Sequence, residues 1–540
     1  MTQVAVLGGG VGGLSAAHEL AERGVDVSLF EARARFGGKA RSMPIDGEGT
    51  LHGEHGFRFF PAFYRHVVDT MARIPDGNGT VADNLVPTSE TLIAGISRPD
   101  RLGETGTPTT VREWFQRLQP AFADDLPRRD VRFLLERLCY LLTACRKRRE
   151  TELEAMSWWE FVDAEHRSPE FRDRLAYATQ SLVALRPQVG SARTIGTIYL
   201  QLLFGQLDPT RPAERVLNGP TNDVWIDPWI DRLTELGVDL HAATPVADLT
   251  LDGDRVSTAV LEDGRTVAAD EFVLAVPVHV APEFVTPSLA RAAPALAGID
   301  RLDTAWMNGI QFYLDDDVEL TRGHQVYTES PWALTSISQR QFWDVAAIDR
   351  RAPDQVEGVL SVIASEWDTP GVVYEKSARN CTREEIAEEI WTQVQSHLNT
   401  NGTRLPEDAL VEWFLDPALV ETESGVENRS PLLINTAGSL RHRPPADTAV
   451  ENLSIAGDYV RTNTDLASME SAAEAGRRAA NAILERHGYD DPARIWELQE
   501  PAVFEPFKRQ DRLRYRLGLP HPAKVTHSLR SLPRAVRRSV

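Results

Sequence analysis

The chain opens with an apolar run, a glycine-rich turn and a helical repeat. Residues 4–7 are Val-Ala-Val-Leu, a strand-like run, and glycines follow it directly. Residues 12–23 carry small and aliphatic side chains at helical spacing, and Gly24 is placed to end a helix. Residues 25–29 alternate apolar and polar positions, and Glu31 follows them. This pattern predicts a strand–turn–helix–strand unit in which the two strands are parallel.

The hydrophobic period changes twice in the rest of the chain. Residues 108–214 repeat apolar side chains every three or four positions, which predicts helices. From residue 244 short alternating runs are separated by Asp-Gly turns, as in an antiparallel meander. The unbroken apolar run 272–276 suits a strand covered on both faces. Further predicted elements are strands at 308–314 and 359–364 and a helix that a capping box opens at Thr382.

Composition narrows the class of protein. With 42% hydrophobic and 25% charged residues in 540, the chain is typical of globular proteins and long enough for several domains. The net charge of −21 argues against a general nucleic-acid binder, because phosphate contacts need a basic surface. The sequence shows neither a signal-peptide pattern nor an apolar run of about 20 residues. Three scattered cysteines, expected as buried thiols, suit a reducing compartment, so a cytoplasmic location is predicted.

The last 33 residues differ in charge from the rest of the chain. From Lys508 to Val540 there are ten Lys or Arg and one acid, Asp511, a net charge of +9. One interpretation is that Phe504, Phe507 and Tyr515 pack this tail onto the acidic body. The other is peripheral contact with anionic lipid, since apolar residues stand between the charges. These apolar residues are Leu513, Leu517, Leu519, Leu529, Leu532 and Val536.

The first turn carries a dinucleotide-binding pattern. Gly8, Gly10 and Gly13 satisfy G-x-G-x-x-G, and Gly12 lies within it. Such a turn lets the backbone approach a pyrophosphate, which the amides at the helix start then face. Glu31, 18 positions after Gly13, ends the second strand where a carboxylate accepts hydrogen bonds from ribose hydroxyls.

The residues after Glu31 distinguish a flavin from a nicotinamide site. Here the sequence resembles the flavin-containing amine oxidase and phytoene desaturase superfamily, in which the glutamate is followed by an R-x-G-G segment. The resemblance implies that the twin glycines pass close to non-covalent FAD and that the basic residues face its phosphates. The matching residues are Ala32, Arg33, Gly37, Gly38, Lys39 and Arg41.

A second segment of the same superfamily lies near residue 460. Ala-Gly-Asp-Tyr at 456–459 and Leu-Ala-Ser-Met-Glu-Ser-Ala at 466–472 are similar to plant-type phytoene and ζ-carotene desaturases, with Ser471 replacing the usual glycine. By this resemblance Gly457 and Asp458 contact the ribityl or pyrophosphate part of FAD. Met469 and Glu470, directly after the cofactor-binding candidate Ser468, start a helix whose positive end faces the flavin.

Two further segments extend the resemblance. The family pairs adenine with the backbone at the position of Val246. Gly56, Phe57 and Arg58 are similar to the desaturase segment beside the flavin ring, where a histidine often replaces Arg58. Arg58 is the one catalytic candidate, as a fixed cation near flavin or substrate. The alternative is that it pairs with Glu54 or with an FAD phosphate. No metal site is predicted.

These features predict an α/β protein (α+β overall) with a discontinuous, Rossmann-like FAD-binding domain. It comprises residues 1–90, 215–290 and 425–490; residues 91–214 and 291–424 form a mixed, helix-rich substrate domain, and 491–540 a basic extension. The predicted apolar pocket comes from the helices of 110–210 or from Trp306, Phe312, Trp332, Phe342 and Trp343.

The expected function is a desaturase or dehydrogenase that transfers hydride from a small apolar, isoprenoid-like substrate to FAD and then to oxygen or a quinone. The alternatives are a flavin amine oxidase, a redox-neutral isomerase or dehydroxylase, and a non-enzymatic FAD-binding subunit. A lysine often holds a water near the flavin of amine oxidases, and none occurs between Pro277 and Glu375.

Overall fold

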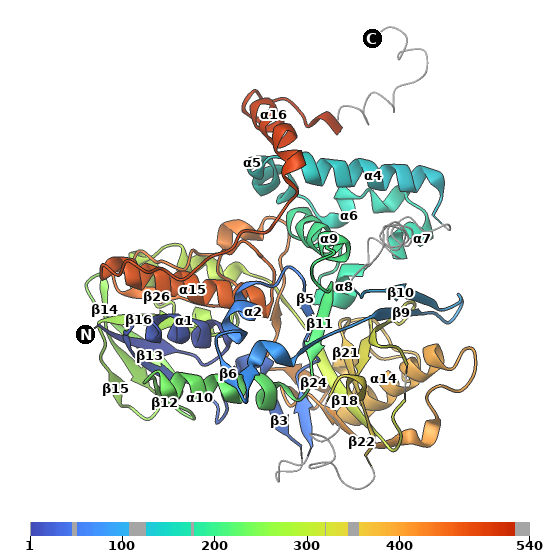
Figure 1. The fold of residues 1–540 in the computed structure, drawn as a ribbon, viewed down its shortest axis with the longest axis horizontal. Coiled ribbons are helices and arrows are strands. Elements are labelled where there is room, and N and C mark those ends of the chain that lie inside the picture. The colour runs from blue at the N-terminus through green and yellow to red at the C-terminus, as the bar shows by residue number, and fades with distance from the viewer. Residues whose placement is uncertain are drawn as a thin grey trace.

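The computed structural model shows three neighbouring parts: a parallel sheet with its helices, a mostly antiparallel sheet with α14, and a group of helices above them (Figure 1). The structure describes residues 2–45, 51–106, 126–173, 178–318, 320–343 and 356–523.

The parallel sheet is assembled from strands far apart in the sequence. Its order is β12-β2-β1-β16-β26, and every neighbouring pair is parallel. The predicted first unit is confirmed, since β1 and β2 flank the helix α1. The bounds are β1 (Gln3–Leu7), β2 (Asp26–Phe30), β12 (Asp239–His241), β16 (Glu271–Leu274) and β26 (Leu453–Ile455).

Helices α1 (Val11–Ala21) and α15 (Met469–Arg486) pack closely against each other. A Cβ atom built on Gly476 of α15 would lie 2.3 Å from the carbonyl oxygen of Gly12 in α1, so only glycine permits this crossing. Helix α10 (Asp227–Glu235) packs on α1 as well. The predicted meander is present as β13 (Val246–Asp252), β14 (Arg255–Leu261) and β15 (Thr266–Val267).

A second sheet has seven strands in the order β10-β9-β19-β20-β21-β18-β22. The two strands of this sheet that the sequence predicts, β18 and β21, are neighbours and are buried along their whole length. The capping box at Thr382 opens α14 (Arg383–Leu398), which packs on this sheet through Trp391 against Phe312. The strand bounds are β9 (Glu90–Ala94), β10 (Arg101–Glu104), β18 (Asn308–Leu314), β19 (Gly323–Tyr327), β20 (Thr335–Ser338), β21 (Gly358–Ala364) and β22 (Leu410–Leu415).

Short elements connect the two sheets. Strands β5, β8 and β11 form a small sheet, and β3 pairs with β4. The loop that carries Gly56–Arg58 follows β4, so both ends of that loop are fixed by strands. The bounds are β3 (Ser42–Pro44), β4 (His52–Glu54), β5 (Phe60–Pro61), α2 (His66–Met71), β8 (Leu85–Pro87) and β11 (Glu214–Leu217).

The predicted helical region 108–214 is largely helical where it is described, and residues 107–125 lie outside the described part. Helix α16 (Glu505–Arg516) of the basic extension packs on this group. The helices are α4 (Arg128–Thr143), α5 (Arg146–Arg148), α6 (Trp158–Phe161), α7 (Pro169–Phe171), α8 (Ala178–Val183) and α9 (Ala192–Leu207).

Among the described residues, no helix combines the length and the hydropathy that a membrane span requires. The expectation that all three cysteines are buried is wrong for Cys139, which lies on an outward position of α4, whereas Cys145 and Cys381 are buried.

Candidate functional site

The turn between β1 and α1 leaves no room for side chains at two of its glycines. Gly8 has a φ of +120°, and a Cβ atom there would lie 2.5 Å from the carbonyl oxygen of Ala275. A Cβ atom on Gly13 would lie 1.9 Å from the carbonyl oxygen of Gly8. Gly10 is different, because the atom nearest to an added Cβ is the Cα of Gly38, 3.8 Å away. The backbone at Gly10 therefore borders open space.

The twin glycines lie directly against this turn. The Gly37 amide donates to the carbonyl oxygen of Gly9 at 2.8 Å, and Gly37 forms an isolated bridge with Gly10. Gly38 has a φ of +59°, and its added Cβ would lie 2.9 Å from the Cα of Gly10. The two sequence motifs thus form one surface of exposed backbone, where a phosphate group can approach closely.

Glu31 lies at the end of β2 and is buried. One carboxylate oxygen accepts from the Gly9 amide at 2.8 Å, and the other accepts from the Arg33 amide at 2.9 Å. The chain before Val246 runs beside this corner, since the Thr244 amide donates to the carbonyl oxygen of Glu31 at 2.8 Å. Each carboxylate oxygen keeps a free lone pair for a ribose hydroxyl. Ala32 lies between these contacts.

The closing segment reaches the same turn from α15. An added Cβ on Gly12 would lie 3.3 Å from the carbonyl oxygen of Ala456, directly before Gly457 and Asp458. Ser468 caps α15 by accepting from the Ser471 amide at 3.2 Å, and Met469 is the first helical residue. The carboxylate of Glu470 accepts from the amides of residues 65, 66 and 67 and thereby caps α2.

Arg58 is turned toward the R-x-G-G segment. Its Nη2 donates to the carbonyl oxygen of Lys39 at 3.0 Å, and its buried Nε has no hydrogen-bond partner among the described residues. It forms no ion pair with Glu54, whose carboxylate accepts from the Thr221 amide at 2.8 Å. Burial lowers the pKa of Arg58, an effect that Glu54 and Asp416 oppose. Arg58 is therefore a cation without a carboxylate partner in the described part of the chain.

Lys39 and Asp458 are oppositely charged residues that influence each other's pKa. Burial lowers the pKa of Lys39, and the carboxylate of Asp458 opposes this shift. Burial likewise raises the pKa of Asp458, which Lys39 and Arg443 oppose. Arg41 donates to the carbonyl oxygen of Gly38 at 2.6 Å, which keeps its guanidinium beside the glycines.

Gly56 and Phe57 contact the seven-stranded sheet. An added Cβ on Gly56 would lie 2.9 Å from the side chain of Ile363 in β21, and the Phe57 ring lies 5.2 Å from that of His324 in β19. The loop 56–58 therefore connects the glycine-lined region with the second sheet.

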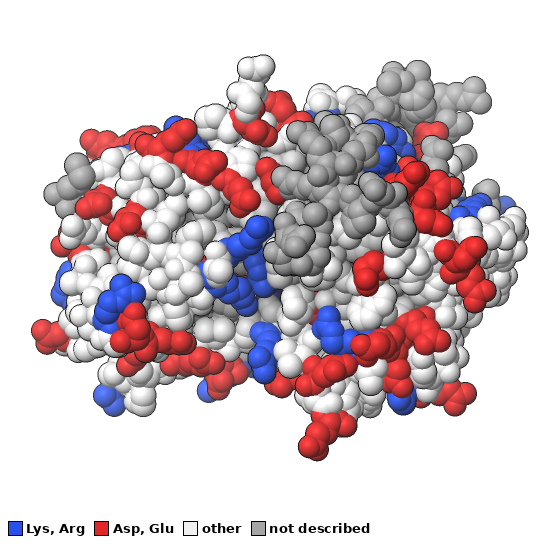
Figure 2. Space-filling view, turned by 90° about the horizontal axis from the view of Figure 1, so that it is seen from below, with Lys and Arg blue, Asp and Glu red and all other residues white. Residues whose placement is uncertain are grey.

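The charged side chains are unevenly distributed on the surface. Seen from below, basic side chains gather in a central hollow, while acidic side chains dominate the periphery (Figure 2).

Two titratable residues at this site, one buried and one half-buried, were missed by the sequence analysis. Asp416 shares a hydrogen bond with His55 and accepts one from Asn308 at 2.6 Å. Burial raises the pKa of Asp416, but these contacts lower it to about 2. Burial and the nearby Lys39 and Arg33 lower the pKa of His279 to about 4, and its buried Nδ1 has no partner among the described residues. Neither residue belongs to a sequence motif, so no signal identified them.

These residues fit the cofactor that the sequence predicts. Gly10 borders open space, and the buried Nε of Arg58 has no hydrogen-bond partner among the residues that the structure describes. A diphosphate needs such backbone exposure, and an unpaired cation suits a flavin that takes up negative charge. FAD would lie along Gly8–Gly13 and Gly37–Gly38, with its ribose at Glu31 and its remaining part near Asp458 and Met469.

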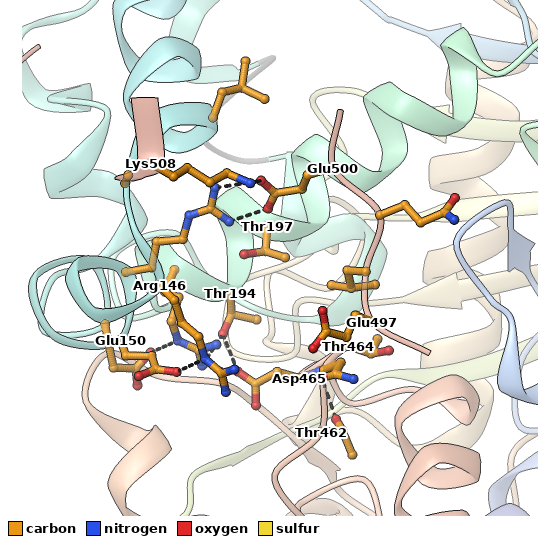
Figure 3. A pocket seen from close by; sticks show the side chains of 18 of the residues that line it. Arg146, Glu150, Thr194, Thr197, Thr462, Thr464, Asp465, Glu497, Glu500 and Lys508 are labelled. Atoms are coloured by element: carbon orange, nitrogen blue, oxygen red, sulfur yellow. Dashed lines mark hydrogen bonds and ion pairs between the residues drawn. The ribbon is translucent and has the colours of Figure 1, made fainter. Parts of the chain in front are cut away.

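A large cavity lies beside the closing segment. Its volume is about 1870 Å³, and α9, the chain from Arg146 to Ala155, residues 461–465 and residues 494–505 line it. Figure 3 shows Thr194 and Asp465 pointing toward each other on one wall, with Lys508 and Glu500 on another. Charged and polar side chains are frequent in this lining.

The predicted pocket aromatics do not line this cavity. Trp306, Phe312, Trp332, Phe342 and Trp343 are absent from its lining, and Phe312 and Trp332 are completely buried beside the seven-stranded sheet. The rings of Trp306, Phe312 and Trp332 pack in the core between that sheet and α14, whereas Phe342 and Trp343 pack in a separate cluster with Tyr313 and Ile337. Helix α9, by contrast, does contribute to the cavity, as expected of the helices of 110–210.

The Arg-His-Arg segment at 441–443 is not simply a solvated loop. Arg443 is buried and donates to the carbonyl oxygens of residues 458, 459 and 460. It also pairs with Asp465, which pairs with Arg193 of α9. Burial alone would raise the pKa of Asp465, but these two guanidinium groups hold it below its usual range. The network fixes the closing segment to the helical part.

We expect Glu31→Ala or Asp458→Ala to reduce FAD retention. Each removes a charge-assisted contact worth about 1.5–3 kcal/mol. FAD content after dilution and desalting measures the effect. Asp26→Ala at the exposed start of the same strand is the control and should retain FAD. Full occupancy in both site variants would contradict the assignment of these residues.

Comparisons with known proteins agree with this geometry. The family model described as flavin containing amine oxidoreductase matches residues 11–484. The chain is 27% identical to the carotenoid phi-ring synthase of Streptomyces griseus, over 90% of this chain and 88% of that protein. It is 23% identical to the zeta-carotene desaturase of Synechocystis sp., over 89% of this chain and 97% of that protein.

Solved structures share the fold at lower identity. Putrescine oxidase bound to putrescine is 15% identical, with a TM-score of 0.62, over 90% of this chain and 99% of that one. Cyclohexylamine oxidase from Brevibacterium oxydans gives a TM-score of 0.60 at 15% identity, over 90% and 99% of the two chains. Since the family model covers most of the chain, the protein belongs to the flavin-containing amine oxidoreductase family.

Proposed function

We propose that the protein is an FAD-dependent desaturase or dehydrogenase that removes a hydride from an apolar, isoprenoid-like substrate. The observation that carries the proposal is that relatives named as a carotenoid phi-ring synthase and a zeta-carotene desaturase match about nine-tenths of the chain. A third, the 15-cis-phytoene desaturase of Synechococcus elongatus, matches 90% of the chain at 23% identity.

FAD, when bound non-covalently, supplies the acceptor for a hydride, while a proton leaves the neighbouring carbon of the substrate and a double bond forms. The electrons then pass to oxygen or a quinone. The chain contributes positive charge where negative charge accumulates, from Arg58, Lys39 and the first turn of α15. The loop 56–58 positions Arg58 between this region and the second sheet.

Two alternatives use the same fold. An amine oxidase is supported by the structural likeness to putrescine oxidase, but at 15% identity that likeness concerns the fold alone. The absence of lysine between Pro277 and Glu375 argues against it. A redox-neutral isomerase or dehydroxylase would use the same cofactor and differ in the fate of the hydride.

Anaerobic bleaching of the flavin absorption band tests the proposal. The holoprotein is mixed with polyenes, terpenoids, steroids and amines, and we expect bleaching with a polyene or terpenoid and none with amines. Bleaching by amines with peroxide release in air would indicate the oxidase. Isomerised product without any acceptor would indicate the isomerase, and flavin that no compound reduces would indicate a non-enzymatic subunit.

We expect Arg58→Ala to slow substrate-dependent flavin reduction at least tenfold while leaving most of the FAD in place. The physical reason is that the variant loses a fixed cation whose contact with the rest of the site is one hydrogen bond to a carbonyl oxygen. Stopped-flow reduction rates and FAD content are compared, with Arg58→Lys as the charge-preserving control. A parallel loss of both quantities would show that Arg58 binds a phosphate instead.

The cytoplasmic location and the domain boundaries at residues 90, 214, 290, 424 and 490 stay predictions.

A further inference from the structure

Helix α16 of the basic extension is docked on the helical part through polar contacts. Asp511, 1% exposed, accepts from Nε of Arg148 at 3.0 Å and from the Cys145 amide at 2.9 Å. Tyr515 shares a hydrogen bond with Thr151 at 3.0 Å, and Lys508 pairs with Glu500 at 2.7 Å. The docking interpretation is thus confirmed for Tyr515, whose ring also lies 5.2 Å from the guanidinium of Arg148, but hydrogen bonds and ion pairs make up most of the contacts.

The inner face of α16 follows from its sequence. Residues 504, 508, 511 and 515 recur at spacings of four, three and four, so they share one side of the helix. All four are buried or half-buried. The expectation that Phe507 packs inward is wrong, because Phe507 stands off this stripe and is 53% exposed.

The outer face of α16 is apolar at its centre and basic at its edges. Leu513 and Leu517 are 61% and 74% exposed, and they lie opposite Asp511 on the helix. Arg509, Arg512 and Arg516 are exposed as well and form no ion pair among the described residues. A helix that buries an aspartate, Asp511, and exposes its leucines reverses the usual arrangement in water.

We propose that this outer face of α16 binds the surface of an anionic lipid bilayer. The pattern of side chains indicates a bilayer, because the leucines can insert into the hydrocarbon while the flanking arginines bind the lipid phosphates. Residues 524–540 add five more basic residues and no acid to the sequence, which strengthens the attraction. A second copy meeting α16 face to face would bring unpaired arginines against one another.

The bilayer face adjoins the large cavity. Lys508 and Arg512 of α16 belong to the cavity lining, as does Phe504 directly before the helix, so α16 forms part of the cavity wall. A lipophilic molecule leaving the bilayer beside α16 would therefore meet this cavity. That consequence depends on the proposed function, whereas lipid binding itself does not.

Co-sedimentation of the FAD-loaded full chain with vesicles tests the proposal. We expect binding to phosphatidylcholine vesicles that contain phosphatidylglycerol, weak binding to phosphatidylcholine alone, and release by high salt. The pair Leu513→Gln and Leu517→Gln should lower the bound-to-free ratio about tenfold. Leu102→Gln on β10 is the matched control, since Leu102 is 59% exposed, and it should bind like the unchanged protein.

A second variant pair, Arg509→Gln with Arg516→Gln, should remove the preference for phosphatidylglycerol without changing FAD content. The proposal is overturned if the unchanged protein stays in the supernatant with both vesicle types. It is also overturned if the leucine variants bind like the control, or if they convert a dimer to a monomer in light scattering while lipid binding is absent. Because no substrate is present, these outcomes are independent of the bleaching experiment.

Discussion

Gly13→Ala should abolish the folded, flavin-loaded protein, and Gly10→Ala should remove the flavin while leaving the fold intact. At Gly13 the new methyl group would lie 1.9 Å from the carbonyl oxygen of Gly8, so β1 and α1 must separate. Because the clash is with backbone rather than with a movable side chain, we expect a cost above the roughly 1–3 kcal/mol that is typical of overpacking. At Gly10 the nearest atom is 3.8 Å away and the backbone is extended, with a φ of −78°.

Thermal unfolding and FAD titration distinguish the two variants. Gly10→Ala should change stability by about 1 kcal/mol or less and lower FAD affinity at least tenfold, because the methyl group occupies the space beside Gly38 that a phosphate would use. If Gly10→Ala binds FAD with unchanged affinity, the cofactor does not lie over this turn. If Gly13→Ala melts like the unchanged protein, the close contact does not govern the fold.

Asp465→Asn should also destabilise the protein strongly, through buried charge rather than through overpacking. Asp465 lies between Arg443 and Arg193, and both its own side chain and that of Arg443 are almost fully buried. Neutralising it leaves buried guanidinium charge without its partner, which costs about 3–5 kcal/mol. Asparagine tolerates the φ of +49° at this position, so the effect reports on charge rather than on backbone strain.

Asp368→Asn provides the control for Asp465. Asp368 also lies between two arginines, Arg186 and Arg379, at 2.7 Å from each, but its side chain is 46% exposed. Water compensates for the loss there, so the cost should stay below about 1 kcal/mol. Melting temperatures with and without added FAD measure both variants. Equal shifts would show that the buried network does not stabilise the closing segment.

The first strand–turn–helix–strand unit was predictable because its signals are local. Gly8 and Gly13 permit the tight turn, the apolar period defines α1, and Gly24 ends the helix, so each residue acts on neighbours within a few positions. The capping box at Thr382 was predictable for the same reason, since Thr382 and Glu385 contact each other directly.

The charged networks were not predictable, because their members are far apart in the sequence. His55 meets Asp416, and Arg193 meets Asp465, only after two sheets and a helix have come together. Nothing about an isolated aspartate distinguishes it from the many that face water. The tail illustrates the same limit: its leucines and arginines are evident in the sequence, but the contacts of Asp511 and Tyr515 with residues more than 300 positions away decide which side of α16 faces inward.

The order of strands in the parallel sheet has a consequence for how the protein is made. The central strand β1 is synthesised first, but its neighbour β16 follows only near residue 271, and β26 and α15 come after residue 452. At about 5–20 residues per second, the ribosome needs on the order of a minute to deliver α15 after α1. During that interval the small-residue face of α1 has no helix to cover it. A chain interrupted before residue 484 consequently retains this exposed apolar face and lacks the cofactor site, which makes it a substrate for chaperones and proteases rather than a slower enzyme.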